Sequence, residues 1–327
     1  MSIEIDPDML PMLEAMRAAP PIDYAAMPIE EARAIFSAGA APWAALAPQV
    51  LQIDDLTLPG AAGALAARLL RPVAGRLPLI VFVHGGGWTF GSIDSHQNEM
   101  RYLALASGAA VLGIDYRLGP EHPFPAGLDD VLATIAYARS GALGEGIDAS
   151  RLALAGDSAG ANLALGAMLA LRDRGTPPVD AAALFYGCYA PVFDTESHRL
   201  FGNGEFGLTT TRMRWYWRNF LGPAIDAPPA WAAPLTAASL DGLPPLHLVA
   251  AGLDLLRDDT LALASRLSAA GIAHEVTTIP GVIHGFLGRA PKLPAAQRTL
   301  TAAGAFLRRH FDATTKGGQP HGTQDVS

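Results

Sequence analysis

One serine of the chain lies in the sequence setting of an activated nucleophile. Ser158 is the centre of GDSAG (156–160), a G-x-S-x-G pattern that carries little weight without its context. An apolar, strand-like run precedes it (151–155) and a helix-like run follows it (160–174). A sharp turn between strand and helix lifts the serine Oγ away from the backbone, and glycines keep Cβ atoms out of that turn. The pattern predicts a nucleophile elbow; the alternative is an ordinary helix N-terminus capped by Asp157 or Ser158.

A run of glycines could supply the hydrogen-bond donors that such a serine needs. HGGGW (84–88) follows the buried, strand-like run 79–83. The tetrahedral intermediate of acyl transfer carries a negative oxygen, which preorganised backbone N–H groups stabilise, and glycines let those groups come close. The candidate oxyanion-hole donors are Gly85, Gly86, Gly87 and Ala159. The alternatives are a flexible turn and a phosphate loop, but the Gly-Lys-Ser/Thr of a Walker A sequence is absent from the motif.

The general base is expected after the serine, because the chain order around an elbow of this kind is serine, acid, histidine. His284 follows the strand-like run 274–279 and lies in a loop. The other histidines after Ser158 lie in strands, on a helix, in an inserted segment or in the tail. His84 precedes the serine, and we expect it to brace the glycine run. The sequence therefore predicts that His284 takes the proton of Ser158.

The acid that orients this histidine is expected at a strand end between the serine and the histidine. Asp254 follows the strand-like run 246–251 directly. Asp258 and Asp259 lie where a helix begins, and they are better explained as N-terminal caps. Asp254 is therefore the predicted acid, which accepts the Nδ1–H of His284, holds its tautomer and stabilises the imidazolium.

Apolar runs alternate with helical patterns along most of the chain, which indicates a mostly parallel α/β sheet with helices on both faces. We expect about eight strands, near 50–58, 64–70, 79–83, 109–114, 151–155, 181–185, 246–251 and 274–279. Helices are expected near 95–107, 126–139, 160–174, 258–270 and 295–310.

The order of the motifs predicts the domain organisation. The serine and the acid lie on either side of 186–243, a stretch rich in aromatic residues, Gly and Pro that is too long for a simple connection. We expect it to be a cap inserted into one catalytic domain, formed by 48–185 and 244–312. The helical patterns of 1–47 are expected to complete the cap, and the polar tail 313–327 is expected to be disordered.

The composition excludes several classes of function. Of the 327 residues, 50% are hydrophobic and 17% are charged, and the net charge is −8. An acidic surface repels phosphate backbones, so no nucleic-acid partner is expected. The single cysteine, Cys188, excludes a disulfide within the chain and a cysteine-based zinc site. No run reaches the about 20 apolar residues of a membrane span, and the N-terminus lacks a basic secretory n-region, so a cytoplasmic location is expected.

Five motifs occur in an order that is far more specific than any one of them. They are HGGGW (84–88), DYRLGPEHPFP (115–125), GDSAGAN (156–162), GLDLLRD (252–258) and PGVIHGF (280–286). With this set the chain resembles the bacterial hormone-sensitive-lipase-like carboxylesterases of the α/β-hydrolase superfamily. The resemblance implies an α/β-hydrolase fold with a helical cap.

The resemblance also implies a role for each matching position. The nucleophile falls on Ser158, the acid on Asp254 and the base on His284. Within the glycine run, Gly86 and Gly87 are the favoured oxyanion donors, together with Ala159. The segment that holds Asp115, Glu121 and His122 is expected to brace the site. The chain departs from the family's usual residues at Gly119 and Ala161, which affects loop geometry and removes no reacting group.

The aromatic residues of the inserted segment are typical of a lid over an apolar acyl pocket. The candidate pocket residues are Phe206, Leu208, Met213, Trp215 and Trp217, with Trp88 and Phe286 from the core loops. The alternative is that these residues pack the cap onto the sheet. Because a cap restricts long acyl chains, the resemblance implies a small, short- to medium-chain ester as substrate. It implies no cofactor and no metal, and a homodimer is expected because relatives are often dimers.

The motifs favour a serine carboxylesterase that acts through an acyl-enzyme. An amidase or deacetylase would use the same three residues and stays open. A non-catalytic ligand-binding protein of the same fold is the third alternative, and the presence of Ser158, Asp254 and His284 counts against it.

Overall fold

One sheet organises the fold. The computed structural model describes residues 4–317, and within them eight strands are hydrogen-bonded in the order β1-β2-β4-β3-β5-β6-β7-β8. The strands are β1 (Gln52–Gly60), β2 (Gly63–Arg71), β3 (Leu77–Val83), β4 (Ala110–Ile114), β5 (Ile147–Asp157), β6 (Ala182–Phe185), β7 (Leu246–Leu253) and β8 (His274–Ile283). Only the β1–β2 and β2–β4 pairs are antiparallel. The predicted mostly parallel, eight-stranded sheet is confirmed.

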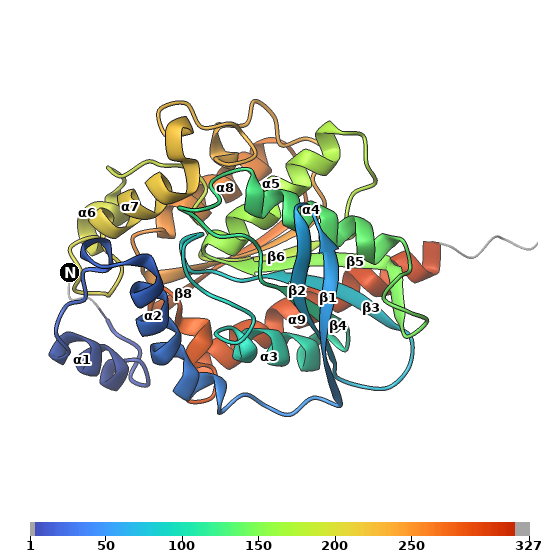
Figure 1. The fold of residues 1–327 in the computed structure, drawn as a ribbon, viewed down its shortest axis with the longest axis horizontal. Helices are drawn as coiled ribbons and strands as arrows, with labels where there is room; N and C mark the ends of the chain where they lie inside the picture. The colour runs from blue at the N-terminus through green and yellow to red at the C-terminus, as the bar shows by residue number, and fades with distance from the viewer. Residues whose placement is uncertain (1–3, 318–327) are drawn as a thin grey trace, which may run out of the picture.

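Helices cover both faces of this sheet (Figure 1). The helices are α1 (Leu10–Ala18), α2 (Ile29–Ala44), α3 (Gln97–Ser107), α4 (Ala126–Arg139), α5 (Ala159–Asp173), α6 (Glu196–Phe201), α7 (Thr210–Leu221), α8 (Arg257–Ala269) and α9 (Pro294–Gly317). Helices α4, α5 and α8 pack on one face, and α3 and α9 pack on the other.

Strand β3 shows why its sequence reads as a continuous apolar run. Leu79, Val81 and Val83 face the core beneath α4 and α5, whereas Ile80 and Phe82 face the core beneath α3 and α9. A strand that is buried on both faces has no polar alternation. The helix after the serine, α5, is buried at every position from Ala159 to Leu171, which fits the apolar sequence of that part on every side.

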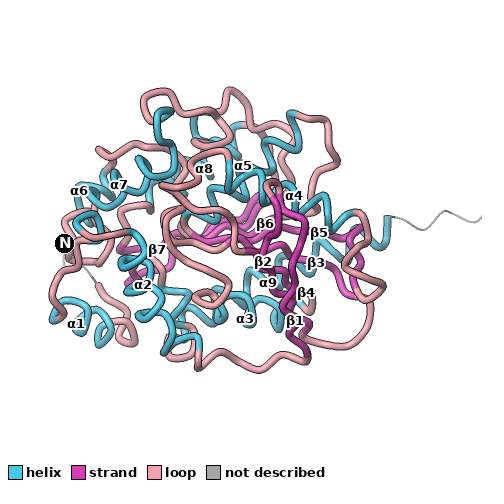
Figure 2. The backbone as a smooth tube through the Cα atoms, viewed as in Figure 1, coloured by secondary structure: helices cyan, strands magenta, loops and turns pink. Residues whose placement is uncertain are grey.

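Two segments that are far apart in the chain lie side by side at one end of the sheet (Figure 2). One carries α1 and α2, and the other carries α6 and α7. Arg17 pairs with Glu205 at 3.0 Å, and Arg212 donates to the carbonyl of Ile22 and lies over the ring of Tyr24. These contacts join the N-terminal helices to the segment inserted between β6 and β7.

The C-terminal helix is longer than predicted. Helix α9 continues through Gly317, so residues 313–317 are helical and the prediction of a disordered tail was wrong for them. Once a helix exists, each added residue gains a hydrogen bond, and a polar sequence without proline does not stop it. The rest of the predicted tail, 318–327, lies outside the described residues. Within the described residues, no helix has the length and apolar character that crossing a membrane requires.

Candidate active site

The turn at the predicted nucleophile is strained. Ser158 lies between β5 and α5 with φ 52° and ψ −119°, a backbone conformation that costs an L residue about 1–3 kcal/mol. Its N–H donates to the carbonyl of Phe185 on β6 at 2.8 Å. The flanking glycine is required, because a Cβ on Gly160 would overlap with the carbonyl of Val83. The Ser158 side chain makes no capping hydrogen bond to α5, so the alternative of an ordinary capped helix does not hold.

The three predicted catalytic side chains lie in one hydrogen-bonded row. His284 Nε2 is 2.9 Å from Ser158 Oγ, and His284 Nδ1 is 2.7 Å from Asp254 Oδ2. Asp254 directly follows β7 and His284 directly follows β8, which is the neighbouring parallel strand. The second Asp254 oxygen accepts from the N–H of Leu256 at 3.0 Å, so the buried carboxylate is fixed from both sides.

The charge of the acid tunes the base. Burial on its own lowers the pKa of His284, but the charge of Asp254, their hydrogen bond and the charge of Asp157 together raise it above its ordinary value. Both carboxylates therefore favour the imidazolium, which is the form that a base reaches after it takes the serine proton.

The pH profile should report this shift. A protonated His284 cannot accept the serine proton, so kcat/KM for an uncharged ester should fall as the pH drops through its raised pKa, with the midpoint above about 6.5. Stopped-time assays from pH 5 to 9 would measure it, and circular dichroism at each pH would show that the fold is retained. A rate that is unchanged down to pH 5 would contradict the assignment of His284 as the base.

Three backbone N–H groups near the serine are free to hold an oxyanion. Among the described residues, the N–H groups of Gly86, Gly87 and Ala159 have no acceptor. Gly86 and Gly87 have φ of +113° and +62°, and a Cβ on Gly87 would overlap with the ring of Tyr216. Gly85 is different, because its N–H donates to Asp157 Oδ1 at 2.8 Å. The prediction that Gly85 also serves as an oxyanion donor is therefore wrong.

Comparison with known proteins bears on the fold and the family of the chain. A family model described as the alpha/beta hydrolase fold matches residues 80–288, which is more than half of the chain. The chain belongs to this α/β-hydrolase family. The match confirms the resemblance that the five motifs predicted and the fold class that went with it.

Named relatives of this α/β hydrolase are ester hydrolases. It is 40% identical over 248 residues to "Carboxylic ester hydrolase LipN" of Mycobacterium tuberculosis, which covers 73% of this chain and 66% of LipN. It is 32% identical to "Acetyl esterase" of Salmonella schwarzengrund, over 81% of this chain and 82% of that protein. Among solved structures, an ester hydrolase from the metagenome of Lake Arreo, complexed with a bipyridine phosphonate derivative, has a TM-score of 0.89. The two share 33% identity, with 94% of this chain and 100% of that chain covered.

In this α/β hydrolase, His84 supports the glycine run and is no base. Its ring stacks on Tyr116 at 4.4 Å, and its Nδ1 is 2.8 Å from the carbonyl oxygen of Gly85. The Tyr116 hydroxyl donates to the carbonyl of His84 at 2.9 Å. Burial first and the charge of His96 second lower the pKa of His84 to about 3, so its ring is neutral at neutral pH.

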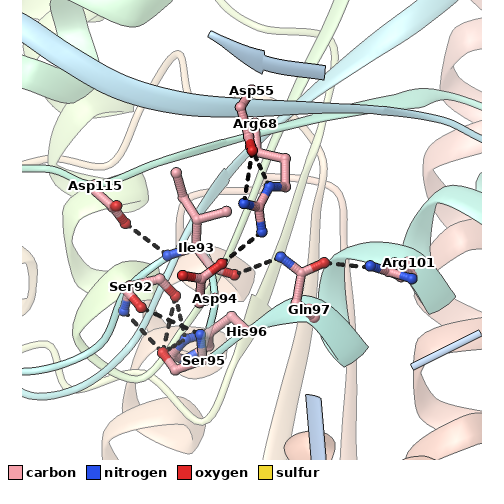
Figure 3. Close-up of polar contacts among 10 residues, drawn as sticks. All are labelled: Asp55, Arg68, Ser92, Ile93, Asp94, Ser95, His96, Gln97, Arg101 and Asp115. Carbon is pink, nitrogen blue, oxygen red and sulfur yellow. Dashed lines mark hydrogen bonds and ion pairs between the residues drawn. The ribbon is translucent and has the colours of Figure 1, made fainter. Parts of the chain in front are cut away.

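Two of the three predicted bracing residues in the segment 115–125 connect it to the same loop, Asp115 directly and Glu121 through Arg33. Asp115 accepts from the N–H of Ile93 at 2.7 Å (Figure 3). Glu121 forms a two-pronged pair with Arg33 of α2, at 2.7 Å for each oxygen. Arg33 also donates to the carbonyl of Thr89, at the end of the glycine loop. The side chain of His122 is exposed and makes no hydrogen bond within the described residues.

Most of the predicted pocket residues are packed inside the protein. Trp88 lies 4.2 Å from Phe220 and 4.6 Å from Trp217 between ring centroids, and Trp88 and Trp217 are each 1% exposed. Phe286 belongs to the core on the α3 and α9 side, against Tyr186. The buried members of the predicted set are Trp88, Phe206, Met213, Trp217 and Phe286, whereas Leu208 and Trp215 are half-buried. The five buried residues fill cores, so the prediction that they present surface to an acyl chain was wrong.

The two acids that were read as helix caps hold the inserted segment instead. Asp258 Oδ2 accepts from the N–H of Ser197, and Asp259 Oδ2 accepts from the N–H of Tyr189 at 2.7 Å. Both donors lie on the chain that leaves β6. Burial raises the pKa of Asp259 to about 7. The loop that carries Asp254 and the start of the insertion are therefore one hydrogen-bonded unit.

Sequence reasoning missed one residue of the site. His96, at the start of α3, is buried and lies 3.4 Å from Asp157 beneath the glycine run. The sequence SIDSHQ (92–97) that holds it forms no motif that we could tie to chemistry. Its only signal is a histidine in the first turn of the helix predicted over 95–107.

Proposed function

We propose that this α/β hydrolase is a serine carboxylesterase that hydrolyses short- to medium-chain acyl esters. The observation that carries the proposal is the row from Ser158 Oγ through His284 to Asp254, at 2.9 and 2.7 Å. It lies beside free N–H groups of Gly86, Gly87 and Ala159. The names of the relatives, carboxylic ester hydrolase and acetyl esterase, support the same bond type.

The acylation half-reaction uses each of these groups once. His284 takes the proton of Ser158 as Oγ attacks the ester carbonyl carbon, and the N–H groups of Gly86, Gly87 and Ala159 hold the oxyanion. Asp254 stabilises the imidazolium that results. His284 then gives its proton to the departing alcohol, which leaves the acyl group on Ser158.

Deacylation repeats the sequence with water. His284 takes a proton from a water molecule, which attacks the acyl carbonyl, and the carboxylic acid leaves as the proton returns to Ser158 Oγ. No step requires a cofactor, because the strained elbow and the row of side chains supply the nucleophile and the base.

A matched pair of substrates tests the bond type. We expect kcat/KM for p-nitrophenyl butyrate to exceed that for p-nitrobutyranilide by about 10³-fold or more, because p-nitrophenolate leaves far more readily than an anilide, which must be protonated by His284 as it departs. Release of nitrophenol and nitroaniline can be followed by absorbance. Comparable values would favour an amidase, and turnover of neither substrate would favour a ligand-binding protein.

The cap should limit the length of the acyl chain. The N-terminal helices and the segment 186–243 are joined by side-chain contacts, and the ring of Tyr216 on α7 lies against Gly87. Trp88, Trp217 and Phe220 fill the space beside them. In a series of p-nitrophenyl esters, we expect butyrate to exceed dodecanoate by about tenfold or more in kcat/KM. Higher activity on emulsified triolein than on butyrate would contradict this.

The proposal includes a cellular location and an oligomeric state. A cytoplasmic location is supported by a single cysteine, Cys188, which is buried and free. A homodimer is supported by the free edge of β8, which pairs only with β7 in the sheet of the described residues and exposes Val276. Strand edges of this kind are templates for pairing with a second copy.

A further inference from the structure

The first glycine of the oxyanion run rests on the residue that precedes the nucleophile. Gly85 follows β3 and Asp157 ends β5, and the N–H of Gly85 donates to Asp157 Oδ1 at 2.8 Å. A Cβ on Gly85 would come within 3.0 Å of Asp157 Cγ, so the loop lies directly on the carboxylate. Since Gly86 and Gly87 follow on one side and Ser158 and Ala159 on the other, this contact sets the spacing between the two halves of the oxyanion hole.

A histidine lies on the same carboxylate from below. His96 Nε2 is 3.4 Å from Asp157 Oδ1. The N–H of Gly85 points at both groups, with Asp157 Oδ1 the closer acceptor at 2.8 Å and His96 Nε2 at 3.2 Å. The exposed fractions of His96 and Asp157 are 7% and 5%. A buried carboxylate that lacks a cationic partner is strongly destabilising, so the charge of Asp157 requires a partner at this position.

The other nitrogen of His96 is also held. His96 Nδ1 is 2.8 Å from Ser95 Oγ and 3.3 Å from the carbonyl oxygen of Ser92. Ser95 Oγ itself donates to the Ser92 carbonyl, so it accepts from His96. Figure 3 shows this serine turn folded around the imidazole, with Ile93 of the turn held by Asp115. His96 Nδ1 therefore carries a proton, and a second proton on Nε2 would face the carboxylate of Asp157, which makes the ring an imidazolium.

The charged groups around His96 agree with that state. Burial on its own lowers the pKa of His96, but the charge of Asp157, their hydrogen bond and the charge of Glu99 raise it to about 9. Glu99 of α3 is itself buried, and burial raises its pKa to about 7. His84, directly after β3, is neutral, since its pKa is about 3. Asp115 adds a further negative charge on the far side of the serine turn.

We propose that His96 and Asp157 form a buried ion pair that positions the oxyanion loop against the nucleophile elbow and screens Asp157 from His284. The proposal rests on the proposed esterase function and deepens it. His96 touches no reacting atom, so it is a positioning residue. Asp157 acts on the base through its charge, because that charge favours the imidazolium of His284.

The two partners therefore affect the base in opposite directions. Removing the charge of His96 leaves Asp157 uncompensated, which should raise the pKa of His284 and move the acid limb of kcat/KM to higher pH. Removing the charge of Asp157 should lower that pKa and move the limb to lower pH. A residue that only fills space would move the limb in neither direction.

His96→Gln tests the positioning role. Gln keeps a hydrogen-bond donor near Asp157 and loses the charge. The active sites are counted by titration with a fluorophosphonate. Per active site, we expect kcat on p-nitrophenyl butyrate to fall about 10- to 100-fold, and we expect KM to stay within about threefold of the wild-type value. This is less than the about 10²- to 10³-fold that follows the loss of an oxyanion donor. His274→Gln, at the opposite end of β8 from His284, is the matched control and should keep the wild-type kcat.

Asp157→Asn and the double variant complete the test. The amide oxygen of the Asp157→Asn variant can still accept from the N–H of Gly85, so the variant removes charge and keeps the contact. The acid limb of its kcat/KM profile should lie at lower pH than that of the wild type. This shift can be measured even if His96→Gln does not fold. The double variant lacks both charges and should return the limb close to the wild-type position. If the variants react with the fluorophosphonate, keep the wild-type kcat and show acid limbs of kcat/KM at the wild-type pH, the ion-pair proposal alone is overturned. A wild-type protein that neither labels nor hydrolyses the ester would overturn the esterase function as well.

Discussion

Ser158→Ala should reduce the hydrolysis of p-nitrophenyl butyrate by about 10⁴-fold or more in kcat. The variant removes the oxygen that His284 Nε2 contacts at 2.9 Å, and with it the acyl-enzyme route. The remaining N–H groups of Gly86, Gly87 and Ala159 can still polarise a bound carbonyl, so a small rate above that in buffer should persist. Initial rates at enzyme concentrations up to the micromolar range would measure the remaining activity.

The structure indicates that this variant keeps its fold. Alanine at 158 has the same positive φ to accommodate as serine, and the side chain makes no hydrogen bond to the backbone of α5. The melting temperature should stay close to that of the wild type. Ser150→Ala, on the exposed start of the same strand, is the matched control and should keep full activity. Full activity in Ser158→Ala would end the assignment of the nucleophile.

Asp254→Asn should reduce kcat by about 10⁴-fold at neutral pH. The carboxylate accepts from His284 Nδ1 at 2.7 Å, and its charge and hydrogen bond contribute more than the charge of Asp157 to raising the pKa of that histidine against the effect of burial. An amide in its place can present its NH₂ group, which favours the wrong tautomer of His284 and gives no charge to stabilise the imidazolium. The residual acid limb should lie at lower pH than in the wild type, and kcat/KM from pH 5 to 9 would show both changes.

A control separates this effect from a general change of charge. Asp241→Asn lies in an exposed turn before β7 and should leave kcat unchanged. If Asp254→Asn kept activity within tenfold of the wild type, another acid would have to orient His284. Asp259 is the neighbouring buried carboxyl, although its own oxygen is engaged by the N–H of Tyr189.

The hydrogen-bonded row of Ser158, His284 and Asp254 could be predicted because chain order and strand ends decide it. Ser158 follows β5, Asp254 follows β7 and His284 follows β8, and the carboxyl ends of parallel strands meet at one edge of the sheet. The apolar runs that define those strands are local in sequence. Nothing in the prediction depended on side-chain packing between distant segments.

The oxyanion run could be predicted only in part, because a run of glycines does not show where each N–H points. Gly85 was expected to serve beside Gly86 and Gly87, yet it is held by Asp157, which lies 72 residues further along the chain. The role of His96 depends on the same distant contact. Such contacts follow from the sheet order β3–β5 and from the tight approach of loop to elbow, which the sequence pattern does not resolve.

The spacing of the aromatic residues of α7 could have predicted from the sequence which of them are packed inside the protein. The buried residues of this helix recur with helical spacing at Met213, Tyr216, Trp217, Phe220 and Leu221. This stripe is the side that packs onto the protein, and Trp215 lies off it and is half-buried. Helical periodicity within the inserted segment thus separates packed aromatic residues from those with exposed surface, whereas aromatic content alone does not.

Covalent labelling with a fluorophosphonate tests the central claim most directly. The probe reacts with a serine Oγ that a neighbouring base activates, so it reports the row from Ser158 to Asp254 without a choice of substrate. Intact-mass measurement and peptide mapping should find one probe per chain, on Ser158, and none on the Ser158→Ala variant. An unlabelled wild-type protein, or a label on another residue with ester hydrolysis retained, would contradict the account.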